Sequence, residues 1–188
     1  MEAFLVSTGV VALGEMGDKT QLLALLLAAR YRRPWPIVAG IFVATLLNHA
    51  AAGALGAWLT RVIDPQWMRW GLGATFLAVA VWMLIPDKPD AMKDKGYGHL
   101  GVFGVTLIAF FLAEMGDKTQ IATVMLAARY DGALWAVVAG TTLGMMLANV
   151  PAVLVGHKAL GFVPIDWVHR IAAIVFAALG VAVLLGIG

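Results

Sequence analysis

Long apolar stretches separated by short polar breaks run through the whole chain. Each stretch is about as long as the roughly 20 apolar residues that an α-helix needs to cross the hydrocarbon core of a bilayer. The stretches lie near residues 3–30, 35–60, 66–85, 100–129, 133–158 and 166–187. The pattern therefore predicts an all-α polytopic membrane protein with six transmembrane helices and short connections.

Composition and aromatic positions agree with this prediction. The 188 residues are 62% hydrophobic and 13% charged, against about 45–50% and about 25% in ordinary soluble domains. Because the first stretch continues past acidic residues for a full span, we expect a transmembrane helix there and not a cleaved signal peptide. Tryptophan rings favour the headgroup level of a bilayer, and all seven fall near the ends of the stretches: Trp35, Trp58, Trp67, Trp70, Trp82, Trp135 and Trp167.

Charge and cysteine content exclude several classes of protein. The formal net charge is only +2 and the basic residues are scattered, which argues against a nucleic-acid surface. The sequence has no cysteine, so disulfides, thiolate metal sites and cysteine nucleophiles are excluded. We also predict no prosthetic group.

The basic residues indicate how the chain crosses the membrane. When alternate loops are placed on opposite sides, one side carries Arg30, Arg32, Arg33, Lys88, Lys93, Lys95, Lys158 and Arg170, and the other carries Arg61, Arg69 and Arg129. By the positive-inside rule, the richer side is cytoplasmic. The loops after the first, third and fifth helices are then cytoplasmic, and both termini lie outside.

The chain contains an internal repeat. The heptapeptide EMGDKTQ at Glu15–Gln21 recurs at Glu114–Gln120, 99 residues later, and further matches follow it in both copies. We therefore predict a first three-helix repeat at 1–86, a cytoplasmic linker at 87–99 and a second three-helix repeat at 100–188. Because three is odd, the second repeat enters the membrane from the opposite side, which gives the inverted repeats typical of secondary transporters.

Each copy of the heptapeptide places two acids near the middle of a predicted helix. A charge at this depth costs at least about 2.5–3.5 kcal/mol, so these acids need partners or a water-filled cavity. On a continuous helix, Asp18 lies about 60° and Lys19 about 40° from Glu15, so all three share one face. If the two repeats pack these faces together, four carboxylates and two ammonium groups leave a formal charge of −2, which one divalent cation neutralises.

The donor atoms predict a site for a hard divalent cation. Carboxylate, amide and hydroxyl oxygens suit Mn²⁺, Ca²⁺ or Mg²⁺. The predicted ligands are Glu15, Asp18, Glu114 and Asp117, and the predicted supporting residues are Lys19, Thr20, Gln21, Asn48, Lys118, Thr119, Gln120 and Asn149. Protons compete with the cation for the carboxylate oxygens, and this competition, coupled to rocking of the repeats, is sufficient for cation/proton antiport.

Several of these residues have a second interpretation. The lysines stand four residues after Glu15 and Glu114, so each is predicted to form an ion pair within its own helix. Gly17 and Gly116 serve either close helix packing or local unwinding of the helix. The two asparagines either bind the ion or join helices, and His49, inside the second predicted helix, is a candidate for the transport pathway.

The paired E-x-G-D-K-T motifs, each on the first helix of a three-helix repeat, closely resemble the signature of the GDT1 family, also called uncharacterised protein family 0016. The resemblance covers almost the whole chain. It implies a six-helix cation/proton antiporter that handles Mn²⁺ and in some members Ca²⁺, with Glu15, Asp18, Glu114 and Asp117 at the cation site. The short central loop and the lack of a targeting extension resemble bacterial members, which export manganese, and imply the bacterial cytoplasmic membrane.

Other functions fit parts of the pattern. An exporter of small organic cations or amino acids would use the acids to bind an ammonium group, but this reading leaves four acids in one place unexplained. An intramembrane aspartyl protease would use Asp18 and Asp117 as a dyad sharing one proton, which needs neither the glutamates nor the lysines. An ion channel differs from a transporter only in kinetics. A homo-oligomer is compatible with the sequence, which does not specify an oligomeric state.

Overall fold

The computed structural model describes residues 1–85, 100–155 and 165–187, so the predicted linker 87–99 lies outside the described residues. Within these ranges the chain is helical and has no strand, which confirms the all-α prediction. The helices are α1 (Glu2–Glu15), α2 (Lys19–Tyr31), α3 (Pro34–Val62), α4 (Pro65–Met83), α5 (Gly101–Glu114), α6 (Lys118–Arg129), α7 (Leu134–Val155) and α9 (Ile165–Leu184).

The predicted continuous helices over 3–30 and 100–129 are wrong at their centres, because each is broken inside the heptapeptide. Helix α1 ends at Glu15 and α2 begins at Lys19, and the second copy breaks in the same way between α5 and α6. The cause is a glycine in the left-handed region, with φ of 83° at Gly17 and 75° at Gly116, a conformation that glycine adopts without steric cost. A Cβ on Gly116 would meet nothing within 4 Å, so this glycine provides backbone freedom and not close packing.

Three helices in the described part of the chain are long and apolar enough to cross a bilayer. They are α3, α7 and the segment Trp167–Leu184 of α9, and α5 is a shorter apolar helix. The predicted count of six spans treats α1 with α2, and α5 with α6, as single crossings. That count stays a prediction, because neither broken pair contains a continuous apolar helix of full length and α4 is not among these three helices.

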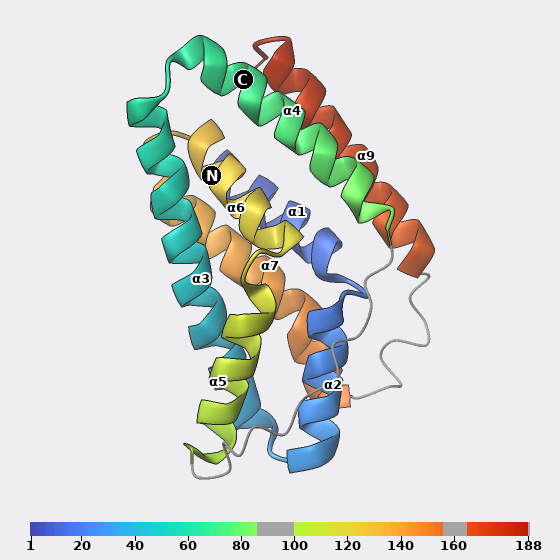
Figure 1. Cartoon of the computed structure of the whole chain (residues 1–188). Coiled ribbons are helices and arrows are strands. Elements are labelled where there is room, and N and C mark those ends of the chain that lie inside the picture. Colours follow the sequence, from blue (N-terminus) through green and yellow to red (C-terminus); the bar gives the residue numbers. More distant parts are fainter. Residues whose placement is uncertain (86–99, 156–164, 188) are drawn as a thin grey trace.

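The two broken helices run in opposite directions through the molecule. Helices α1 and α2 lead away from the end where both termini lie, and α5 and α6 lead back toward it (Figure 1). Helix α1 packs along α7, and α5 packs along α3. Each broken helix of one sequence repeat therefore lies against the long helix of the other repeat.

Glycines bring these helix pairs into close contact. A Cβ on Gly140 in α7 would lie 2.5 Å from the Phe4 carbonyl oxygen and 3.0 Å from the Ser7 Cβ. At the equivalent position in α3, a Cβ on Gly40 would lie 2.8 Å from the Thr106 Cβ. Small residues let helix backbones approach within a membrane, where van der Waals packing drives association.

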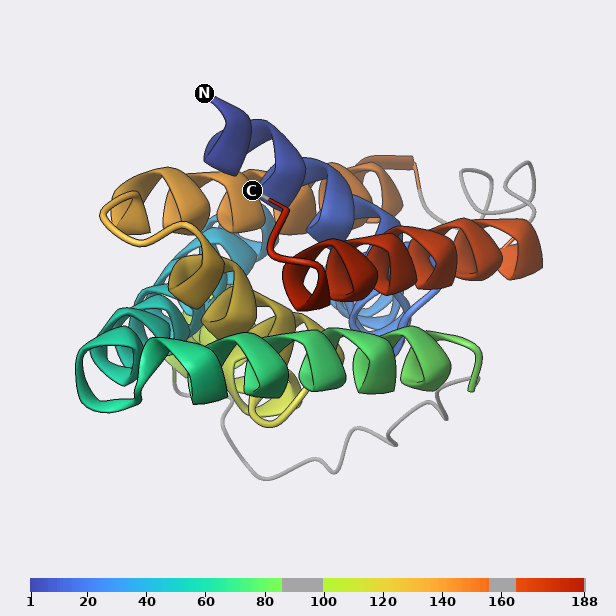
Figure 2. The ribbon, with the colours of Figure 1, turned by 90° about the horizontal axis from the view of Figure 1, so that it is seen from above.

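Helices α4 and α9 form a pair of their own beside this core (Figure 2). Their contact includes the rings of Phe76 and Phe176, whose centroids are 6.2 Å apart. Helix α9 also packs against α1, and α4 packs against α6. Their main contacts with the core therefore lie on the α1 and α6 half of the molecule.

We predict that Gly140→Ala destabilises the protein, because the added Cβ meets a backbone oxygen that cannot move independently of α1. The expected loss is about 1–3 kcal/mol, measured as a lower melting temperature in detergent. Gly9→Ala is the matched control, since a Cβ there meets nothing within 4 Å and alanine favours the helix. Equal melting temperatures for the two variants would show that α1 and α7 are not packed as described.

Candidate metal site

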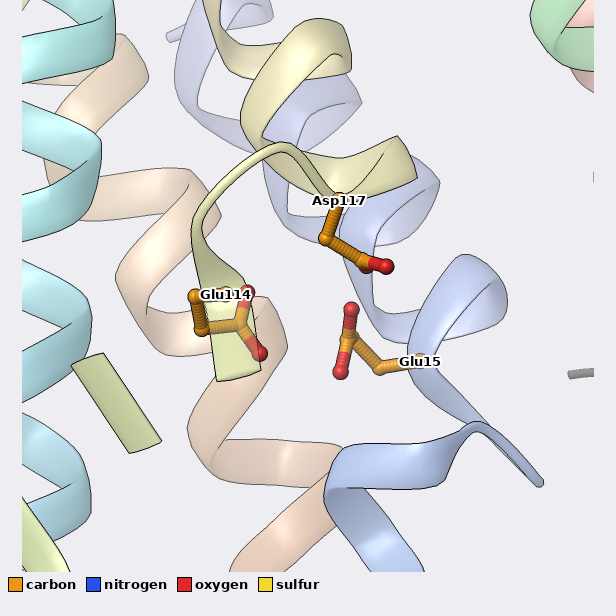
Figure 3. Close-up of side chains that lie close together, drawn as sticks. All are labelled: Glu15, Glu114 and Asp117. Atoms are coloured by element: carbon orange, nitrogen blue, oxygen red, sulfur yellow. The ribbon is translucent and has the colours of Figure 1, made fainter. Parts of the chain in front are cut away.

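Three buried carboxylates from both copies of the heptapeptide meet between the two helix breaks. Glu15 is the last residue of α1, Glu114 is the last residue of α5, and Asp117 directly precedes α6. One oxygen from each of the three lies within 4.8 Å of the others, and Figure 3 shows Glu15 pointing toward Asp117, with Glu114 beside them. The arrangement thus combines one acid of the first copy with two of the second.

The spacing of these oxygens fits a single hard cation. Mg²⁺ and Ca²⁺ hold oxygen ligands at about 2.0–2.6 Å, so ligands on opposite sides of one ion are about 4–5 Å apart. The 4.8 Å limit on the three oxygens lies within this range. Each of the three residues is at most 2% exposed, so an ion here would be shielded from solvent.

Threonine hydroxyls hold one oxygen of each glutamate and leave the other oxygen without a partner. Thr20 Oγ1 donates to Glu15 Oε2 at 2.6 Å, and Thr119 Oγ1 donates to Glu114 Oε2 at 3.2 Å. Oε1 of both glutamates is buried and has no hydrogen-bond partner among the described residues. An unsatisfied buried acceptor is costly, so each glutamate keeps an oxygen that can still accept a proton or a cation.

Glutamine side chains hold the two broken backbones in place. The Gly17 amide donates to Gln21 Oε1 at 2.9 Å, and the Gly116 amide donates to Gln120 Oε1 at 2.7 Å. The same side chains then reach the long helices. Gln21 Nε2 donates to the Ala148 carbonyl of α7 at 2.7 Å, and Gln120 Nε2 donates to Asn48 Oδ1 of α3 at 3.3 Å. Each break is therefore fastened to the other repeat.

Each lysine lies beside an acid of the opposite copy, and not on one continuous helix face with its own glutamate as the predicted ion pairs required. Lys19 Nζ lies 2.9 Å from Asp117 Oδ1, and Lys118 Nζ lies 3.7 Å from Asp18 Oδ1. The predicted pairing assumed continuous helices, and the breaks at 16–18 and 115–117 remove the common helix face. The two lysines also differ in burial, because the Lys19 side chain is 20% exposed and that of Lys118 only 2%.

The other predicted residues fall around this centre in different ways. Asp18 is buried beside Lys118 but lies outside the group of three carboxylates. Asn48 joins helices, because its Nδ2 also donates to the Phe111 carbonyl of α5 at 3.0 Å. Asn149 Nδ2 donates within α7 to the Met145 carbonyl at 3.1 Å, and His49 is buried with neither ring nitrogen bonded to a described residue.

One contact at the break has no signal in the sequence. His169 of α9 lies with its Nε2 3.0 Å from the Met16 carbonyl oxygen, and since a carbonyl only accepts, this nitrogen carries the proton. His169 stands near the start of the last predicted helix, about 150 residues from the motif. Only the tertiary packing of α9 on α1 brings the two together.

Comparison with known proteins identifies the family. A model of the family described as divalent cation/proton antiporter GDT1 matches residues 3–91 and 102–187. The chain belongs to the GDT1 family. GDT1 proteins are transporters, and together with the apolar helices this makes the chain an integral membrane protein.

Named relatives of this GDT1 protein agree with the assignment. A Vibrio cholerae serotype O1 protein named "Putative manganese exporter" is 48% identical, over 97% of this chain and 90% of that protein. A GDT1-like protein of Synechocystis is 28% identical over 94% of this chain and 93% of its own. The divalent cation/proton antiporter GDT1 of Saccharomyces cerevisiae is 29% identical over 50% of this chain and 33% of its own. No solved structure matches the chain.

We predict that the ion pair between Lys19 and Asp117 couples the two repeats. Lys19→Met should lower the free energy of unfolding by about 1–3 kcal/mol, because it removes the ammonium group that is paired with the buried Asp117 carboxylate. In the Asp117→Asn background the same change should be less damaging, with an interaction energy of about 0.5–3 kcal/mol. Both are measured by detergent melting curves in metal-free buffer.

The control for this cycle is Lys19→Met in an Asp64→Asn background. Asp64 is exposed and accepts a hydrogen bond from the Gln66 amide at the start of α4, a role that asparagine also performs. The two changes should therefore be additive. Additivity in the Asp117 background as well would contradict the cross-repeat ion pair.

Proposed function

We propose that this GDT1 protein exports Mn²⁺, with Ca²⁺ as a second substrate, from the cytosol in exchange for protons. The observation that carries the proposal is the group formed by Glu15, Glu114 and Asp117, with oxygens within 4.8 Å of one another. Oε1 of both glutamates lacks a partner among the described residues. These three residues bring negative charge and carboxylate oxygens together inside the protein, which is what a divalent cation requires.

The choice of ion is supported by donor chemistry and by the relatives. All the converging side-chain donors are oxygens, which favours hard cations, and the sequence has no cysteine. The 48% identical relative carries manganese in its name, and the yeast relative is named a divalent cation/proton antiporter. We therefore place Mn²⁺ first among the divalent ions that the site would accept.

Exchange for protons follows because the metal ion and protons bind the same carboxylate oxygens. When the metal leaves, the carboxylates of Glu15 and Glu114 remain in an apolar interior, where an uncompensated charge is costly. Protons can neutralise them there, and an arriving metal ion must displace those protons. Protons bound after the metal departs therefore return to the other side with the empty transporter, which gives antiport.

Lys19 is the internal cation that the metal displaces. Its ammonium lies 2.9 Å from Asp117 Oδ1, and its side chain is 20% exposed, so it has a route away from the site. Lys118 is 2% exposed and has no comparable freedom. Metal entry would move Lys19 off Asp117 and leave the second ion pair in place.

The proposed topology is two inverted three-helix repeats, 1–86 and 100–188, in the bacterial cytoplasmic membrane. Helices α1 with α2, and α5 with α6, would each make one crossing, which gives six in all. The opposite directions of these pairs (Figure 1) support the inversion. The excess of basic residues in the loops after the first, third and fifth crossings places those loops in the cytoplasm and both termini outside.

We predict that carboxylate neutralisation abolishes transport without unfolding the protein. Glu15→Gln, Glu114→Gln, Asp117→Asn and Asp18→Asn should each lower Mn²⁺ flux by about 10–100-fold or more. The assay is proteoliposomes under an imposed pH gradient, with Ca²⁺ and Mg²⁺ in parallel. Asp64→Asn, an exposed acid far from the site, should transport normally. Normal flux in any two of the four variants would remove the carboxylate site, and flux that ignores the pH gradient would indicate a channel or uniporter.

We also predict that Mn²⁺ stabilises the protein and that acid weakens this effect. A ligand at 100 times its Kd adds about 2.7 kcal/mol, which is measured as a rise in melting temperature. Because protons and metal share the oxygens, the apparent affinity should fall by up to about tenfold per pH unit for each proton displaced. The rise should therefore be smaller at pH 6 than at pH 8, and absent in Glu114→Gln. Equal stabilisation at both pH values would contradict shared binding, and no stabilisation by any divalent ion would favour an organic-cation exporter.

A further inference from the structure

Helices α4 and α9 pack on only one side of the core formed by the two broken helices and α3 and α7. The residues on the two sides of this core correspond to each other in the sequence repeat. Met125 in α6 is 3% exposed, and it packs in one cluster with Phe76 and Met83 of α4. The equivalent residue of α2, Leu26, is 48% exposed. In the same way Leu112 of α5 is 52% exposed, whereas its counterpart in α1, Leu13, packs against that cluster. The pair thus lies on α1 and α6, and among the described helices no equivalent pair covers the corresponding faces of α5 and α2.

The hydrogen bond from His169 to the Met16 carbonyl marks this asymmetry at the binding site. It joins the covering pair to the unwound segment of the first heptapeptide at 3.0 Å. At the other break, Met115 is 57% exposed. The residue of the first repeat that corresponds to His169 is Arg69 of α4, 100 positions earlier. Met115 corresponds to Met16, because the heptapeptide recurs after 99 residues. In this state the Arg69 guanidinium lies 5.8 Å from the Trp70 ring centroid, and a Cβ on Gly186 at the end of the chain would lie 3.6 Å from its Nη1.

We propose that His169 is a positioning residue of the transport cycle, which holds the α4 and α9 pair over the first break in one state. In the opposite state the pair lies on α2 and α5, and Arg69 binds the Met115 carbonyl in its place. The proposal rests on the proposed transport function for its role in a cycle, but the hydrogen bond can be tested without any flux measurement. Each of the two states then has its own side-chain donor for an unwound carbonyl.

The chemistry of the two residues suits this exchange. A carbonyl released by a helix break needs a donor inside a membrane protein, and both a protonated ring nitrogen and a guanidinium provide one. A single hydrogen bond of this kind is weak enough to break during each cycle, since hydrogen bonds between helices within membranes make only modest contributions to stability. His169 therefore biases the two states without locking either.

Distances between spin labels test the proposal directly, because the chain has no cysteine of its own. One label pair replaces Trp35 and Ile174, and the second replaces the equivalent Trp135 and Ala74, all four of which are exposed. When the protein changes state, the two label pairs should trade their distances. The labels at 35 and 174 should then be as far apart as the labels at 135 and 74 are in the state described. In wild type, the state described should predominate.

His169→Leu should raise the population of the exchanged distances about three- to tenfold, and His169→Gln, which keeps an N–H donor, should restore the wild-type distribution. Arg69→Leu should lower the exchanged population. Arg170→Gln is the control, since Arg170 is exposed and stacks on Trp167 with its guanidinium 5.5 Å from the ring centroid, and it should leave the distances unchanged.

The outcomes separate this proposal from the proposed function. Wild-type distances in His169→Leu, or no rescue by His169→Gln, would overturn the role of His169 even if Mn²⁺ transport is normal. If the wild-type protein moves no divalent cation, the antiport proposal fails, but the predicted shifts in distance would still establish the hydrogen bond as the element that favours one state. If the protein transports Mn²⁺, His169→Leu should also lower the maximal rate several-fold. The Mn²⁺ concentration that gives half the maximal rate should change by a smaller factor.

Discussion

The burial of several charges at one point inside an apolar helix bundle is the constraint on which the rest of this structure depends. Glu15, Glu114 and Asp117 are together within 4.8 Å and nearly inaccessible, a combination that is strongly unfavourable without compensation. The compensation comes from the Lys19 ammonium group and from two threonine hydroxyls. Because each lysine pairs with an acid of the opposite copy, the charges also join the two repeats. With both lysines counted, the four acids of the two motifs still carry a formal charge of −2, and Oε1 of each glutamate has no hydrogen-bond partner among the described residues.

The glycine in each heptapeptide makes this arrangement possible. On a continuous helix, Glu15 and Lys19 would lie on one face and neutralise each other, and their charge would be unavailable for a partner. The positive φ of Gly17 and Gly116 ends one helix and starts another within three residues. The ammonium groups are thereby directed across the interface, and Gln21 and Gln120 bind the amides that the breaks expose. One backbone feature therefore determines both the pairing of charges and the anchoring of each break.

The sequence predicts the helical fold and three of the residues that meet, because both depend on strong local signals. Apolar runs and an exact heptapeptide repeat are visible without any knowledge of packing, and they point to Glu15, Glu114 and Asp117. The partners of Lys19 and Lys118 could not be predicted, since helix periodicity assumes an unbroken helix. The position of Asp18 outside the carboxylate group and the contact of His169 with Met16 depend on how distant helices pack. No spacing in the sequence records that packing.

The two heptapeptides are identical but lie in different surroundings. The conformational state that the protein adopts must therefore depend on residues outside them. Lys19 is partly exposed and Lys118 is buried, although the residues on either side of them are the same. The difference must come from elements that distinguish the halves, above all the placement of α4 and α9 on α1 and α6. If both halves had identical sequences throughout, the two placements would have equal free energy. The balance between states is therefore set by positions where the repeats differ, such as His169 against Arg69, and Asn48 against the Ala148 backbone carbonyl. The shared motif keeps the chemistry of the binding site the same in both states.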